Sequence, residues 1–175
     1  MTKLSQTTDL FDPKAPAIQK RLELLKSPMK MRLFYLQRLP TLWWWGVTVV
    51  DCSPYSVQVK LPYGWRTQNP FQSIYFAAQL GAAELSTGII GMLATLGRGR
   101  ISMLVTKIES EFVKKANTDT IFRCDDGQKI IDAVQEALDT GEGRIVRSMS
   151  VGTQQSGEVV SRVYVTWSFK KKSSR

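Results

Sequence analysis

The chain has 175 residues, of which 43% are hydrophobic, and this length and composition predict one globular domain with a full hydrophobic core. It contains no histidine and two cysteines, Cys52 and Cys124, which excludes a Ser-His or Cys-His nucleophile pair within the chain, a disulfide framework and a structural zinc site. The net charge of +9 predicts attraction to an anionic partner, such as a phosphate-bearing molecule, nucleic acid or a membrane surface.

The cysteine content and the N-terminal sequence bear on location. Free cysteines without a disulfide framework are typical of a reducing compartment. The first 16 residues lack the apolar core that a signal peptide needs. We therefore expect a cytoplasmic protein.

The first third of the chain predicts two helices followed by a hairpin. Residues 16–26 and 28–38 read as short helices, because each has a proline near its first turn. The second is amphipathic and basic, and we favour packing across the open side of a sheet over contact with an anionic membrane. Residues 42–53, with three consecutive tryptophans, and the alternating residues 55–61 predict two antiparallel strands.

Residues 69–96 predict one long and almost uncharged helix. Asn69 is a favourable N-cap, and Pro70 suits the first helical position. The stretch is long enough to span a membrane. We interpret it instead as the core helix of a soluble fold, because it contains a carboxylate and several glycines and because strands flank it.

Glu84 is the single carboxylate of this helix. A buried, ionised carboxylate costs several kcal/mol unless it is paired or hydrogen-bonded. Glu84 therefore lies exposed at a cleft, is neutralised by a partner, or serves a chemical role. Small residues share its helix face and allow a sheet, a second subunit or a ligand to approach closely; they are Ala77, Gly81, Gly88, Gly91 and Thr95. Packing explains the glycines but not Glu84.

The rest of the chain predicts four more strands and one short helix. The strands cover residues 101–115, 120–124, 144–154 and 158–170, and the helix covers 127–139. The fold class is therefore α+β.

This order of elements, with Asn69 and Glu84, resembles the hotdog fold, in which a curved antiparallel sheet wraps one long helix. The closer resemblance is to phenylacetate-pathway-like hotdog thioesterases and to a related family of domains of unknown function. It extends over residues 39–169 and includes the sequence LVTKIESEFVKKANTDT at residues 104–120. It implies a hotdog domain at 39–170. The two N-terminal helices then form a helical extension at 1–38, and the basic residues at the end form a tail at 171–175.

The same resemblance implies roles for individual residues. The family's asparagine and acid match Asn69 and Glu84, whereas its His-Gly-Gly turn is replaced by Tyr75, Phe76 and Ala77. Glu84 would activate water or attack directly, Asn69 would position water or the carbonyl, and the Phe76 amide would stabilise the oxyanion. The predicted substrate-binding residues are Tyr75, Ala77, Gly81, Gly88, Arg98, Arg100, Lys114 and Lys115, the last four for the phosphates of coenzyme A.

Two functions follow as expectations. The first is hydrolysis of acyl-CoA or another acyl thioester by a homodimer or a dimer of dimers, in which Glu84 and the first-turn amides come from different subunits. We expect this reaction to need no metal and no cofactor. The second is a non-catalytic hotdog domain that binds an acyl group, another apolar ligand or a protein. Nucleic-acid binding rests only on the net charge, and we do not favour it.

Overall fold

The computed structural model describes residues 10–172. Its helices are α1 (Pro16–Leu25), α2 (Pro28–Arg38), α3 (Pro40–Trp45), α4 (Phe76–Thr95) and α5 (Gly127–Thr140). Its strands are β1 (Thr48–Cys52), β2 (Val57–Leu61), β3 (Ile101–Phe112), β4 (Thr120–Cys124), β5 (Arg144–Gln154) and β6 (Val159–Lys171). Residues 1–9 of the predicted N-terminal extension and 173–175 of the predicted basic tail lie outside the described residues.

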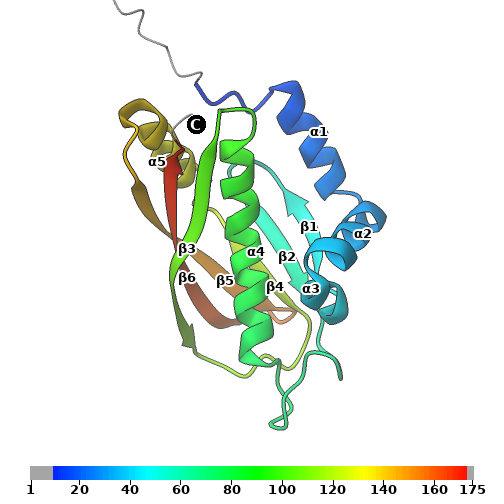
Figure 1. Cartoon of the computed structure of the whole chain (residues 1–175). Coiled ribbons are helices and arrows are strands. Elements are labelled where there is room, and N and C mark those ends of the chain that lie inside the picture. The colour runs from blue at the N-terminus through cyan, green and yellow to red at the C-terminus, as the bar shows by residue number, and fades with distance from the viewer. Residues whose placement is uncertain (1–9, 173–175) are drawn as a thin grey trace, which may run out of the picture.

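The six strands form one antiparallel sheet in the order β1-β2-β4-β5-β6-β3. The sheet curves around α4, which lies across its inner face, while α1, α2 and α3 lie together on one side of α4 (Figure 1). This is the arrangement that the sequence resemblance predicts. The strand β3 forms one edge of the sheet, and β1, beside α1 and α2, forms the other.

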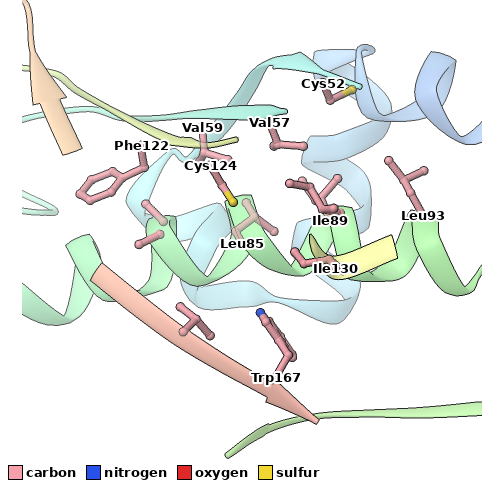
Figure 2. Close-up of a cluster of buried hydrophobic side chains, with 14 of the residues drawn as sticks. Cys52, Val57, Val59, Leu85, Ile89, Leu93, Phe122, Cys124, Ile130 and Trp167 are labelled. Atoms are coloured by element: carbon pink, nitrogen blue, oxygen red, sulfur yellow. The ribbon is translucent and has the colours of Figure 1, made fainter. Parts of the chain in front are cut away.

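The core lies between α4 and the sheet. Leu85, Ile89 and Leu93 of α4 are packed among strand residues such as Val59 and Phe122 (Figure 2). The helix is long and apolar enough to cross a membrane by length and composition. However, 61% of the 18-residue apolar stretch that meets this criterion is buried within the protein. Its apolar character is therefore explained by its position inside the curved sheet.

Buried polar pairs fix α4 on the sheet. Ser161 of β6 donates a hydrogen bond to the side-chain oxygen of Gln79, at 2.9 Å. Ser86 donates to Ser150 of β5, at 2.8 Å. Because buried polar groups are costly without a partner, these bonds define the position of the helix along the sheet.

The prediction of a strand over residues 42–53 is wrong in its first half. Residues 40–45 form α3, which begins with Pro40 at its first position and ends at Gly46, with a φ of 72°. A left-handed glycine is a common helix terminator, and the strand begins only at Thr48. In the helix the tryptophans point in different directions: Trp44 contacts Trp65, and Trp45 lies against Gly81 of α4.

The long helix begins at Phe76 and not at Asn69, so the prediction of Asn69 as its N-cap is also wrong. The Asn69 side-chain oxygen accepts hydrogen bonds from the Phe71 amide at 3.0 Å and from the Ser73 amide at 3.2 Å. These bonds form a local turn that includes Gln72 at a φ of 58°. The N-cap position belongs to Tyr75.

Candidate functional site

Glu84 lines a cavity of about 320 Å³ on the side of α4 that faces α1 and α2. Leu24, Met31 and Phe34 form the wall from α1 and α2, and Met103 and Trp167 form the wall from β3 and β6. The lining is almost entirely apolar, and Arg21 is the other charged residue among the described residues that line it.

The carboxylate of Glu84 has no hydrogen-bond or ion-pair partner among residues 10–172. Arg21 lines the same cavity, but no ion pair within 4.0 Å joins the two side chains. Burial raises the pKa of Glu84 above its ordinary value of 4.5, because the apolar surroundings disfavour the charged form. A half-buried, unpaired carboxylate is typical of a group kept available for chemistry.

A hydrogen-bond pair holds the wall opposite α1 and α2. The indole N–H of Trp167 donates to the Thr87 hydroxyl at 2.9 Å, and that hydroxyl donates to the backbone oxygen of Glu84 at 2.9 Å. The Trp167 side chain extends from β6 toward α4 (Figure 2). Gly88 makes room for it, since a Cβ at Gly88 would lie 3.3 Å from the indole. Trp167 is thereby fixed beside Glu84.

A second cavity, of about 650 Å³, lies at the N-terminal end of α4. It is lined by Asn69, Tyr75, Phe76, Lys114 and Lys115, together with other residues of the loop before α4 and the end of β3. The backbone amides of Phe76 and Ala77 open the helix, and neither has a hydrogen-bond partner among residues 10–172. Free first-turn amides stabilise negative charge.

The oxygen and the nitrogen of the Asn69 carboxamide have different surroundings. Its oxygen holds the turn before α4, which leaves the two N–H donors of the carboxamide without a partner in the described part of the chain. Lys115 donates to the Phe71 backbone oxygen at 3.3 Å, and Lys114 pairs with Glu158. This cavity therefore combines amide donors with two ammonium groups.

The two cavities are separate within one chain. No lining residue is common to them. Phe76 and Glu84 are eight helical residues apart, which corresponds to about 12 Å along the helix axis. Reacting groups must approach a common atom to about 3 Å. One chain therefore does not bring the carboxylate and the first-turn amides to one carbonyl.

The aromatic residues that replace the family's histidine and glycine occupy the entrance of the second cavity. The rings of Tyr75 and Phe76 meet edge to face, with centroids 4.8 Å apart. Both side chains are substantially exposed, at 44% and 50%. Two exposed aromatic rings therefore lie beside the first-turn amides.

The other predicted binding residues are spread over the molecule. Ala77 lies in the first turn of α4, and Gly81 accommodates Trp45, which explains it by packing. Arg98 follows the C-terminal end of α4, where it donates to the Ala94 backbone oxygen. Arg100 is exposed beyond it, so these two arginines do not form one basic patch with Lys114 and Lys115.

Sequence reasoning missed the residues that enclose Glu84. Leu24, Met31 and Phe34 lie in the segment predicted as an extension outside the domain, and Trp167 lies in the strand predicted at 158–170. The available signal was the run of apolar residues in the two basic N-terminal helices. Among residues 10–172 no group of three or more His, Cys, Asp or Glu side chains is placed to hold a metal ion.

Solved structures share this architecture. A Pseudomonas aeruginosa protein described as a probable thioesterase has 19% sequence identity and a TM-score of 0.66, over 88% of this chain and 95% of its own. A putative thioesterase from Shewanella oneidensis has 10% identity and a TM-score of 0.68, over 86% and 99% of the two chains. A thioesterase from Haemophilus influenzae has 12% identity and a TM-score of 0.62, over 83% and 91%. The predicted hotdog fold is confirmed.

At the level of sequence, no curated protein matches the chain significantly. A family model described as a domain of unknown function, DUF4442, matches residues 30–169, which is most of the chain. This agrees with the predicted resemblance to an uncharacterised hotdog family. The chain belongs to the DUF4442 family, with the hotdog fold of thioesterase-like proteins.

Proposed function

We propose that this protein hydrolyses acyl thioesters and that Glu84 is its catalytic carboxylate. The observation that carries the proposal is the unpaired carboxylate of Glu84, half-buried on the central helix and facing an apolar cavity. The thioesterases among the structural neighbours support the same reaction class through their common fold.

In the proposed reaction, the Glu84 carboxylate takes a proton from water as the water oxygen attacks the thioester carbon. The carbonyl oxygen gains negative charge, which the first-turn amide of Phe76 stabilises. The carbon–sulfur bond then breaks, and the proton passes to the sulfur. The products are a carboxylic acid and a free thiol. Direct attack by Glu84, followed by hydrolysis of the anhydride, gives the same products.

The separation of about 12 Å between Glu84 and the first turn means that this mechanism needs a second copy of the chain. The edge strand β3 is the surface that fits this role. It has twelve residues and carries exposed apolar side chains, namely Leu104 at 62%, Ile108 at 40% and Phe112 at 47% exposure. Such an edge favours pairing with another strand. We therefore propose a homodimer joined through β3.

Hydrolysis of a panel of acyl-CoA thioesters, followed through free-thiol release, tests the activity. The panel contains short, long and aromatic acyl groups. We expect turnover that saturates with substrate. Absence of turnover for every member by a folded, dimeric protein would remove the proposal.

The pH profile is a second expected result. Glu84 must be ionised to act as a base, and burial raises its pKa above 4.5. The rate kcat/KM therefore increases as pH rises through a pKa that lies above the ordinary glutamate value. A profile of kcat/KM against pH checks this, and an acidic limb at or below pH 4.5 would contradict it.

Two substitutions of Asn69 separate its structural task from its proposed catalytic task. Asn69→Asp keeps the oxygen that holds the turn but removes the amide donors, so we expect wild-type thermal stability and a rate about 100- to 1,000-fold lower. Asn69→Ala also loses the turn, and we expect a free energy of unfolding about 1–3 kcal/mol lower. Thermal melting and kcat/KM check both, and an active Asn69→Asp variant would assign Asn69 to structure alone.

The alternative is a non-catalytic domain that binds an acyl group. The exposed rings of Tyr75 and Phe76 at the entrance to the first-turn amides favour it. Binding without turnover predicts that acyl-CoA raises the melting temperature of the protein while no thiol is released. Thermal melting beside the thiol assay distinguishes the two functions.

A further inference from the structure

Helices α1 and α2 form half of the cavity around Glu84. The apolar side chains of Leu24, Met31 and Phe34 line the cavity on this side, opposite Met103 and Trp167. The cavity of about 320 Å³ is at the lower end of the range for small-ligand sites, about 300–1,000 Å³. An apolar cavity of this size beside a catalytic carboxylate suits the apolar part of a substrate.

The inner boundary of this cavity is thin. Leu25 and Met31 also line a third cavity, which is apolar, has a volume of about 250 Å³ and lies between α2, α3 and β1. Both residues are buried, at 2% and 4% exposure. These two side chains are therefore a partition between the cavities, and Met31, being unbranched, adapts its shape readily.

The charge of the cavity limits what occupies it. Glu84 is unpaired, and Arg21, the other charged residue of the described lining, forms no ion pair with it, so a free carboxylate beside Glu84 would meet like charge in an apolar environment. An uncharged thioester carbonyl avoids this repulsion, whereas the carboxylate product is driven out. Most of the apolar lining residues are aliphatic, with Phe34 and Trp167 as the aromatic ones, and such a lining suits a flexible hydrocarbon chain.

We propose that α1 and α2 select the length of a straight acyl chain, which runs from a thioester carbonyl at Glu84 into this cavity and ends against Leu25 and Met31. The proposal rests on the proposed function for the position of the carbonyl. In this proposal Met31, at the end of the cavity, and Leu24, on its wall, determine the length of acyl chain that the cavity accepts.

Binding of S-alkyl coenzyme A thioethers tests this without hydrolysis, because the thioether cannot be cleaved by water. The probes have butyl, octyl, dodecyl and hexadecyl chains, and calorimetry measures their affinity. For the wild type we expect affinity to rise by about fourfold per methylene group until the cavity is full, and then to level off.

Three variants are expected to differ in how their affinity depends on chain length. Met31→Ala opens the partition, so affinity continues to rise with longer chains. Leu24→Trp fills the cavity, so the rise ends at a shorter chain. Leu33→Ala is the matched control, because Leu33 lies on α2 with its side chain 58% exposed and lines neither cavity. Leu24 is only partly buried, whereas Met31 is buried in the core, so Leu24→Trp keeps the test valid if Met31→Ala does not fold.

The outcomes separate this inference from the proposed hydrolysis. The same chain-length profile in the wild type, Leu24→Trp and Met31→Ala overturns the inference, even where Glu84-dependent hydrolysis is found. If the variants shift the dependence of affinity on chain length but no hydrolysis is found, the acyl cavity is supported and the proposed hydrolysis is contradicted. Absence of thioether binding by the folded wild type overturns the inference.

Discussion

Replacing Glu84 by glutamine is expected to lower kcat/KM by about 100- to 10,000-fold, the usual contribution of a general base. The same substitution is expected to raise the melting temperature at neutral pH. The pKa of Glu84 is raised by burial, so the folded protein holds this proton more tightly than the unfolded chain does. The charged form therefore costs stability above that pKa, and glutamine removes the cost.

The sign of the stability effect gives a further check. At a pH well below the ordinary glutamate value of 4.5, Glu84 is neutral in both states, and the glutamine variant has no advantage. The advantage grows as pH rises from that value through the raised pKa. Thermal melting as a function of pH measures it, beside kcat/KM for the same samples.

Glu136→Gln is the matched control for this experiment. Glu136 lies on α5, exposed and paired with Arg144, and it lines neither the Glu84 cavity nor the cavity at the first turn of α4. We expect wild-type activity from it. A Glu84→Gln variant that retains wild-type kcat/KM would eliminate Glu84 as the base.

Placing a lysine at Ile108 is expected to convert a dimer into a monomer and to lower hydrolysis at least about 100-fold. Ile108 lies on the edge strand β3 with 40% of its surface exposed. A charged side chain there opposes pairing of two β3 strands. Activity is lost because Glu84 and the first-turn amides would no longer meet. Light scattering during size-exclusion chromatography measures the mass, and the thiol assay measures activity.

Ile145→Lys is the matched control. Ile145 is 69% exposed but lies on β5, which is not an edge strand of the sheet, and it pairs with Ser168 of β6. We expect a dimer with wild-type activity. A fully active monomeric Ile108→Lys protein would contradict a site built from two chains.

Mixing two inactive variants gives a stricter test of the shared site. A heterodimer of Glu84→Gln and Asn69→Asp chains has one site with both residues intact and one site with neither. After random subunit exchange we expect about a quarter of the wild-type activity. If each site belonged to one chain, mixing would restore nothing.

Local patterns were sufficient for most elements. The alternation of residues 55–61 predicted β2, and the apolar run with a single charge before Gly97 predicted the C-terminal end of α4. The alternation reflects burial of one face of the strand, and the apolar run reflects burial of most of the helix. Both kinds of burial are visible in the residue types alone. Glu84 was conspicuous for the same reason, as one carboxylate in an apolar run.

Two errors came from local signals that a competing interaction overrode. The tryptophan run has strand propensity, but Pro40 and Gly46 enclose it as a short helix. Asn69-Pro70 is a favourable helix start, but the Asn69 oxygen instead accepts bonds from the Phe71 and Ser73 amides and forms a turn. Asparagine serves both purposes equally well, so the residue type alone does not distinguish them.

The sequence was enough to identify a hotdog-like order of elements and to single out Glu84, because periodicity and the placement of one charge are local properties. The surroundings of Glu84 depend on tertiary structure. Trp167 meets the helix through a hydrogen bond to Thr87, 80 positions away, and Leu24 reaches the cavity from the opposite end of the chain. Contacts over such separations arise from how the sheet curves around α4, and no local pattern records that curvature.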